Sequence, residues 1–170
     1  MFHWDLPQAL EDAGGWRSRA TVDAFGRYAD TIVTAFHDDV KHWFTINEIL
    51  CFTVLAHTGA MDKAPGTPRS AAELNQSIHH ALIAHGHGVR AVREHGRRGS
   101  IVGNAEVPHG LVPLTETPAD IEAARRVYRE ANDQIFAPPL TGGYSTARLR
   151  RLGRDRPRVA RGDFDLIALP

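Results

Sequence analysis

The protein has 170 residues, the size of a single domain. Hydrophobic residues make up 42% of the chain, charged residues 24% and aromatic residues 8%, and these fractions exclude disorder over the full length. The 20 basic and 20 acidic residues cancel, and the pI is near 7.2. The chain therefore lacks the charge pattern of a general nucleic-acid binder or a binder of anionic membranes. A complete eight-stranded β/α barrel takes roughly 250 residues, and about 200 at the least, so a whole barrel is excluded too.

The single cysteine, Cys51, cannot form an intrachain disulfide, which suits a reducing cytoplasm. The first residues contain no basic segment followed by an apolar run, and no stretch of about 18 apolar residues occurs. We therefore expect a cytoplasmic protein with no signal peptide and no membrane-spanning segment.

Apolar periodicity and turn residues predict three strands that alternate with helices. In chain order, the expected elements are a strand end in residues 1–7, helices at 8–13 and 20–37, a strand at 42–47, helices at 48–56 and 70–95, a strand at 100–104, and helices at 118–136 and 145–152. We expect the rest of the tail, 137–170, to be irregular. This alternation is typical of right-handed βαβ units and a parallel sheet.

Chemically useful side chains follow each predicted strand. They are residues 3–5 after the first strand, Asn47 and Glu48 after the second, and residues 104–106 after the third. In parallel α/β folds, functional groups gather at the carboxyl ends of the strands. An amide beside a carboxylic acid is a candidate acid/base pair. The alternative is that Glu48 only caps the helix that follows it.

Two longer motifs surround these positions. Residues 3–16 contain HWDLPQAL followed by GGW, and residues 41–48 are KHWFTINE. They resemble the third- and fourth-strand signatures of family 1 glycoside hydrolases, the β-glucosidase family, in which Thr-x-Asn-Glu-Pro carries the acid/base. The similarity continues through HALIAHG, SIVGN, EAARR and GDFDLI, so it covers nearly the whole chain. The resemblance implies an α/β fold, a single partial (β/α)8 TIM-barrel domain over residues 1–170 with about three parallel βα units, corresponding to strands three to five.

The resemblance also implies roles for five side chains. Glu48 matches the general acid/base, which protonates the departing glycosidic oxygen and then activates water. Asn47 matches the residue that hydrogen-bonds the sugar 2-hydroxyl, and His3 matches the histidine that binds the hydroxyls of the glycone. Trp4 shapes that subsite, and Asn104 matches an asparagine at the end of the fifth strand. The implied ligand is a β-glucoside or a related glycoside, and we expect no cofactor and no metal.

The chain departs from the family pattern in two places. Retaining hydrolysis needs two carboxyl groups about 5–5.5 Å apart, and the family's nucleophile motif, Thr-Glu-Asn-Gly, does not occur in this sequence. The partial match at 115–117 (TET) lies in a predicted loop. Ile49 stands where the family has proline, which restores a backbone N–H and frees φ. We therefore expect the isolated chain to be weak or inactive.

The sequence is compatible with three functions. The first is the acid/base part of a β-glycosidase, and the second is a partial barrel that binds a sugar or a glycosylated metabolite, or assembles with a partner, without hydrolysis. The third is a remodelled enzyme that uses Glu48 with Glu106, which lies on the same side of an extended chain as Asn104. A gap of roughly 6.5–9.5 Å between the two carboxyl groups suits inverting chemistry. Alternatively, Glu106 is a solvated loop acid.

A slice of three parallel strands leaves two sheet edges and the inner face of the sheet exposed. Unpaired edges invite pairing with another chain. We therefore expect this chain to associate with itself or with a complementary chain.

Other suggestive residues have simpler explanations. His80, His85 and His87 lack the i, i+4 spacing of helical zinc pairs, and the place of His85 on an apolar helix face predicts a core or interface histidine. Cys51 lies in an apolar stretch, which is typical of a buried structural thiol. The basic segment 148–151 (RLRR) and the arginines after it are expected to form a solvated face.

Overall fold

A computed structural model describes residues 1–59 and 63–168. The two strands, β1 (His42–Asn47) and β2 (Ile101–Ala105), are parallel, with Trp43 opposite Val102. Phe2 forms a parallel bridge with Ile46 on the other edge of β1. Its N–H donates to the Thr45 carbonyl over 2.9 Å, and its carbonyl accepts from Asn47 N–H over 3.0 Å. The three predicted strand positions therefore lie side by side in the order expected of βαβ units.

The helices follow the sequence pattern closely up to residue 136. They are α1 (Gln8–Asp12), η1 (Gly15–Arg17), α2 (Arg19–Phe36), the π-helical turn η2 (Cys51–Leu55), α3 (Ala56–Thr58), α4 (Ala71–His95), α5 (Pro118–Thr141), α6 (Thr146–Leu152), η3 (Gly153–Asp155) and α7 (Asp163–Ile167). Ser70 caps α4 with a reciprocal bond to Glu73, and Thr117 caps α5, whose first residue is a proline. No helix in the described part of the chain is long and apolar enough to cross a membrane.

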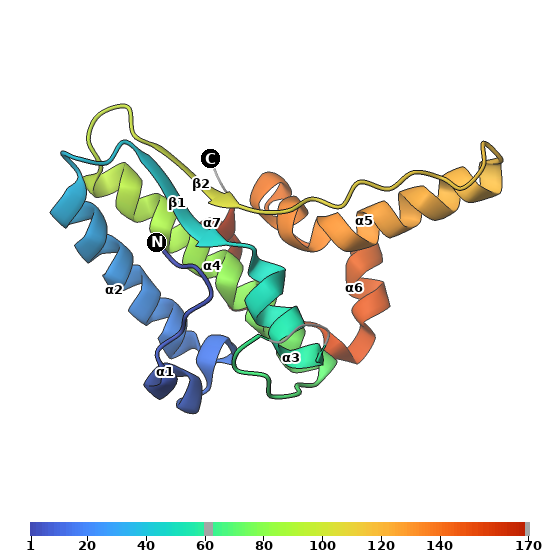
Figure 1. Ribbon diagram of the computed structural model, residues 1–170, viewed down its shortest axis with the longest axis horizontal. Coiled ribbons are helices and arrows are strands. Elements are labelled where there is room, and N and C mark those ends of the chain that lie inside the picture. The colour runs from blue at the N-terminus through green and yellow to red at the C-terminus, as the bar shows by residue number, and fades with distance from the viewer. Residues whose placement is uncertain (60–62, 169–170) are drawn as a thin grey trace.

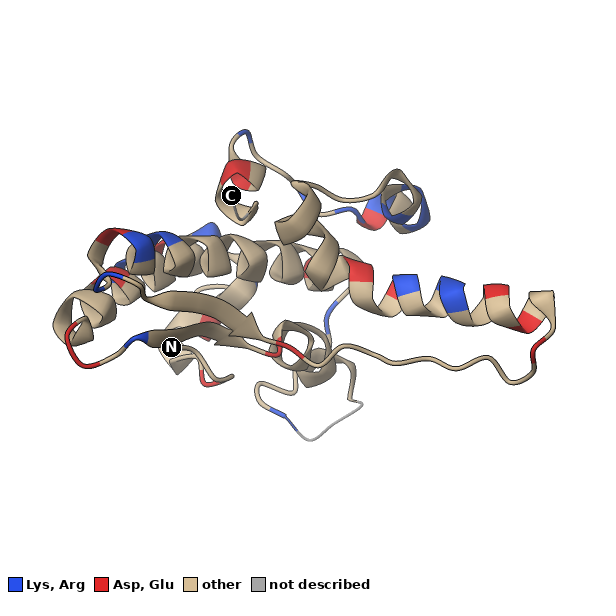
Figure 2. Cartoon of the chain, turned by 90° about the horizontal axis from the view of Figure 1, so that it is seen from above, with Lys and Arg blue, Asp and Glu red and all other residues tan. Residues whose placement is uncertain are grey.

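The core lies between α2, α4 and one face of the two strands. Helix α4 runs behind β1 and β2, and α2 packs beside it (Figures 1 and 2). Thr45 of β1 is fully buried and its hydroxyl lies 2.6 Å from Nδ1 of His85, which confirms His85 as a core histidine. A Cβ on Gly88 would lie 2.6 Å from the Thr45 side chain. The sheet can approach α4 this closely only because residue 88 is a glycine.

The other face of the sheet is open in this structure. Successive side chains of a strand point to opposite faces, so Phe44 points away from the helices that cover Thr45. Phe44 is 61% exposed, and Ile101 at the start of β2 is 62% exposed. The long loop before α5 also carries solvated apolar side chains, and Leu114 is 93% exposed. The layer of helices therefore covers one side of the sheet only.

The carboxyl-terminal prediction was wrong in two respects. Helix α5 continues through Pro138 and Pro139 to Thr141, because both prolines are buried and their packing compensates for the hydrogen bonds that proline cannot donate. The tail also forms α7, in which Ile167 is fully buried. Tertiary contacts decide both outcomes, and local sequence propensity does not report them.

The basic tail is only partly a solvated face. Arg148 on α6 is 6% exposed, donates to Gln134 of α5 and lies over the Tyr144 ring. Arg151 is more exposed and pairs with Glu130 of α5 over 2.8 Å. The prediction for Arg148 was therefore wrong, because the long helix α5 provides a surface on which α6 packs (Figure 1).

Candidate functional site

The predicted site residues lie at the carboxyl ends of the three strands. Trp4, just after the first strand position, donates its indole N–H to the carbonyl of Asn47 over 3.2 Å. Glu48, just after β1, donates its backbone N–H to the carbonyl of Ala105 at the end of β2 over 2.7 Å. These two bonds tie the three strand ends together, so residues from all three segments share one edge of the sheet.

Glu48 has an unusual backbone conformation. Its φ is +47°, a left-handed value that few residues other than glycine adopt. The side chain is half-buried, and one carboxylate oxygen, Oε2, accepts a hydrogen bond from the Cys51 thiol over 3.1 Å. The Cys51 N–H also donates to the Glu48 carbonyl over 2.9 Å. Glu48 therefore directly precedes the helical segment, and Cys51 of that segment holds the Glu48 carboxyl group through the thiol hydrogen bond.

The prediction that Cys51 is a buried structural thiol was wrong in part, because the residue is only half-buried. The thiol is half-buried and contacts the candidate acid directly. Partial burial and the hydrogen bond to Glu48 raise the pKa of the Cys51 thiol to about 11. A spacing of three residues within a helical turn is the sequence signal for this contact.

The glycone-binding candidates are arranged around Trp4. Trp4 also has a positive φ, +70°, and its ring lies under the Lys63 ammonium group, 3.2 Å from Nζ to the ring centroid. The exposed ring of His3 meets the Trp4 ring edge-on at 5.0 Å between centroids. Lys63 comes from a long irregular loop, and no local sequence pattern pointed to its place beside Trp4.

Glu106 is neither solvated nor isolated, so its interpretation as a loop acid in water was wrong. It is half-buried, and its Oε1 accepts hydrogen bonds from Ile49 N–H over 3.0 Å and from the Asn104 amide over 3.2 Å. Burial raises the pKa of Glu106 to about 7, and the charge of the nearby Glu48 adds to that effect. The carboxyl groups of Glu48 and Glu106 are therefore close enough for the charge of Glu48 to raise the pKa of Glu106.

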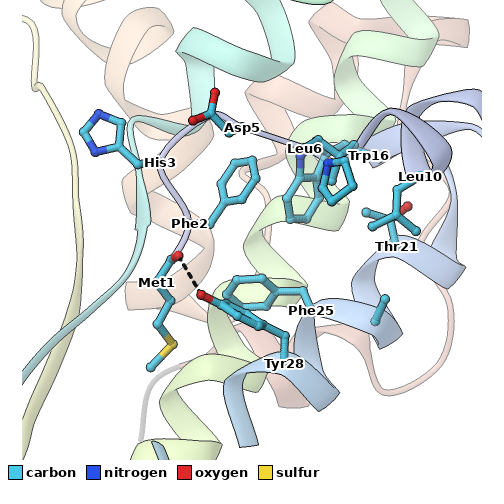
Figure 3. A pocket seen from close by; sticks show the side chains of 12 residues that line it. Met1, Phe2, His3, Asp5, Leu6, Leu10, Trp16, Thr21, Phe25 and Tyr28 are labelled. Atoms are coloured by element: carbon cyan, nitrogen blue, oxygen red, sulfur yellow. Dashed lines mark hydrogen bonds between the residues drawn. The ribbon is translucent and has the colours of Figure 1, made fainter. Parts of the chain in front are cut away.

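Two cavities border some of the predicted site residues, but the lining of neither cavity includes Glu48, Asn47 or Trp4. One, of about 500 Å³, lies between the amino-terminal segment and the helices α1 and α2 (Figure 3). Its lining is mostly apolar and aromatic, and it includes His3 and Asp5. The other, of about 470 Å³, includes Asn104 and Glu106 in its lining and lies against α5. The predicted glycone residue His3 and the predicted residue Asn104 therefore line separate cavities in this structure.

The histidines of α4 serve the packing of the core. Nε2 of His79 lies 2.9 Å from the Asp163 carboxylate and Nδ1 lies 3.0 Å from the Tyr144 hydroxyl. Nδ1 of His80 lies 2.8 Å from the Trp16 carbonyl. Among the described residues, no group of three or more histidine, cysteine, aspartate or glutamate side chains is placed to hold a metal ion.

Comparison with known proteins relates the chain to one enzyme family. The family model described as glycosyl hydrolase family 1 matches residues 1–169. A β-glucosidase of Agrobacterium sp. is 36% identical over 168 residues, which are 99% of this chain and 36% of that protein. Thermostable β-glucosidase B of Thermobispora bispora is also 36% identical, over 91% of this chain and 33% of its own length. The chain thus spans about a third of the length of these relatives.

Solved structures agree. The virulence factor SghA from Agrobacterium tumefaciens superposes with a TM-score of 0.89 at 34% identity, covering 99% of this chain and 37% of that one. SghA has also been solved in complex with its substrate analogue salicin. The rice β-glucosidase Os3BGlu6 superposes with a TM-score of 0.89 at 30% identity, covering 99% and 38%. The arrangement described above, with parallel strands backed by helices, is therefore part of a TIM-barrel fold, as predicted.

Proposed function

Because the chain belongs to glycosyl hydrolase family 1, we propose that it supplies the acid/base side of a β-glycosidase site that hydrolyses O-glycosidic bonds. Glu48 protonates the departing glycosidic oxygen and afterwards takes a proton from the attacking water. Asn47 hydrogen-bonds the sugar 2-hydroxyl. His3 and Trp4 contact the hydroxyl groups and the face of the glycone, and Asn104 lies at the neighbouring strand end.

One observation carries this proposal. Glu48 follows the last residue of β1, and its peptide group is hydrogen-bonded to the end of β2. A catalytic group on such a strand end is held by the sheet itself, which limits its motion relative to a bound sugar. The same end of the sheet carries Asn47 and Trp4, so a hydrogen-bonding amide and an aromatic ring lie next to the acid.

The covalent step requires a second carboxylate. A retaining site places it about 5–5.5 Å from the acid/base, and the family's Thr-Glu-Asn-Gly motif does not occur in this sequence. We propose that other strands of the barrel supply that nucleophile, since this chain matches only 36% of the length of the Agrobacterium relative. The segment by itself should therefore hydrolyse glycosides weakly or not at all.

The partner of this segment follows from the same reasoning. The sheet face that carries Phe44 is open, and a β/α barrel buries that face by closing its sheet into a ring. We propose that polypeptide carrying further βα units, or a second copy of this chain, covers the exposed edges and inner face.

A chimaera tests the function directly. Residues 1–168 of this chain replace the matching segment of the Agrobacterium β-glucosidase, and the protein is assayed with a chromogenic aryl β-glucoside. We expect turnover by the chimaera and little or none by the isolated chain. Glu48→Gln should abolish most of that turnover, and azide should restore part of it, because an anionic nucleophile needs no general base.

The control variant is Glu116→Gln, which changes an exposed loop carboxylate in the same way and should leave turnover unchanged. Circular dichroism confirms that each variant is folded. A folded Glu48→Gln chimaera with the activity of its parent would contradict the proposal.

A further inference from the structure

The backbone on both sides of Glu48 is held by two consecutive residues of the neighbouring strand end. The Glu48 N–H donates to the Ala105 carbonyl over 2.7 Å, and the next N–H, that of Ile49, donates to Oε1 of Glu106 over 3.0 Å. The first bond orients the peptide group before the Glu48 Cα, and the second orients the peptide group after it. Together they restrict the two dihedral angles that set the direction of the Glu48 side chain.

Such a restraint is needed because the conformation of Glu48 is unfavourable by itself. A residue with a Cβ is strained in the left-handed region and persists there only where its surroundings impose that conformation. Without the bond from Ile49 N–H to Glu106, the backbone at Glu48 would lose one of the contacts that keep this residue in the left-handed region, where its φ is +47°. A proline at position 49 has no N–H, so it would leave the Glu106 carboxyl without this donor.

Glu106 is itself held in place for this contact. The Asn104 amide, two residues before it, donates to the same Oε1 over 3.2 Å. Both hydrogen bonds thus converge on one oxygen of a half-buried carboxyl group, and neither involves the Glu48 side chain. Oε1 is already committed to the protein, which favours a supporting role over direct attack on a substrate.

We propose that Glu106 is a positioning residue for Glu48, its carboxyl group anchoring the peptide that follows Glu48 and so fixing the direction of the acid/base side chain. This inference rests on the proposed role of Glu48 in glycoside hydrolysis. An ionised carboxylate accepts a hydrogen bond more strongly than a neutral one, so the anchor strengthens as Glu106 loses its proton. The titratable side chains around it are Glu48 and Cys51 on the segment after β1, and Tyr128 and Asp133 on α5, which line the same cavity as Glu106.

Nuclear magnetic resonance of the whole chain tests the anchor without any need for activity. The Ile49 amide resonance is followed between pH 5 and 9 in the wild type, in Glu106→Gln and in Glu106→Ala. We expect a transition with a midpoint near the pKa of Glu106, about 7, in the wild type. Glu106→Gln retains an acceptor and should abolish the transition. Glu106→Ala should in addition shift the Cα and Cβ resonances of Glu48, which report its left-handed conformation.

The matched control, Glu116→Gln, should leave both sets of resonances and the transition unchanged. An Ile49 transition that persists in Glu106→Gln would overturn the anchor, and so would Glu48 resonances that do not move in Glu106→Ala. These outcomes do not depend on turnover, so they separate the anchor from the function proposed for Glu48.

The active chimaera then tests the consequence for catalysis. We expect Glu106→Ala to lower kcat about tenfold with little change in KM, since the acid is misdirected while sugar contacts remain. Glu106→Gln should have a smaller effect, because it retains an acceptor for Ile49 N–H. An unchanged kcat in a folded Glu106→Ala chimaera would overturn the positioning role even if the anchor is present.

Discussion

The backbone N–H of Ile49 and the carboxyl group of Glu106 form a 3.0 Å hydrogen bond between residues that lie 57 positions apart in the sequence. Ile49 is fully buried, and Glu106 is half-buried beside it. The bond joins the ends of β1 and β2 at the residue that follows the candidate acid. Several measurable properties of the chain depend on this junction and on the packing behind it.

The stability of the chain should depend on the ionisation of Glu106. Burial raises the pKa of Glu106 from 4.5 to about 7, so the folded chain binds this proton more tightly than the unfolded chain. The contribution of protonated Glu106 to the free energy of unfolding is therefore fully present below about pH 4.5 and is lost as the pH rises through 7. Glu106→Gln removes this loss. We expect the variant to be more stable than the wild type at pH 8.5. The difference should be only about 1–2 kcal/mol, because partial exposure of Glu106 screens part of the electrostatic effect. At pH 4.5 the two proteins should be equally stable.

Urea unfolding at the two pH values provides this measurement. Glu116→Gln, at an exposed position, should follow the wild type at both. A Glu106→Gln variant that is less stable than the wild type at pH 8.5 would show that the ionised carboxylate stabilises the fold on balance.

Cys51 should react slowly with alkylating reagents. Its pKa is raised from 9.0 to about 11, and only the thiolate is nucleophilic. At neutral pH we expect iodoacetamide to modify the folded chain about 100-fold more slowly than the urea-unfolded chain, in proportion to the thiolate fraction. Glu48→Gln removes the charged acceptor of the thiol proton, so it should speed the reaction. Equal rates for folded and unfolded protein would contradict the contact between Cys51 and Glu48.

Gly86 should tolerate no larger residue, because α7 packs directly against α4 at this point. A Cβ at residue 86 would lie 1.9 Å from the carbonyl oxygen of Leu166. We expect Gly86→Ala to reduce the free energy of unfolding by about 1–3 kcal/mol, since the two helices must separate. Gly103→Ala is the control, because nothing lies within 4 Å of a Cβ there. Equal stability of the two variants in a urea titration would mean that α7 does not pack on α4.

The open sheet face should mediate association of the isolated chain. Phe44 is 61% exposed on that face, so Phe44→Asp should weaken association without disturbing the core. Sedimentation velocity over a range of concentrations measures the effect. Val159→Asp changes an apolar residue that is 43% exposed in the segment before α7, and it should have no such effect. A wild-type chain that sediments as a monodisperse monomer and melts cooperatively would contradict the prediction.

Local patterns in the sequence were sufficient to place most elements. Strand β1 has the predicted bounds, and α4 begins one residue after its predicted start, because apolar periodicity and capping residues act within a few positions of each other. The same patterns placed Asn47 and Glu48 at a strand end, and the motif around them identified the family. The roles of these side chains in hydrolysis stay predictions until the variants above are measured.

Tertiary structure decided what depends on segments far apart in the chain. The register between β1 and β2 brings Glu106 to the N–H of Ile49, and the surface of α5 buries Arg148, which sequence alone assigned to solvent. Helix α5 passes through Pro138 because packing outweighs the lost hydrogen bond there. Composition and periodicity depend on the preferences of neighbouring residues, so they predict helices and strands. Contacts between distant segments depend on how whole elements pack against one another, and no local pattern in the sequence specifies that packing.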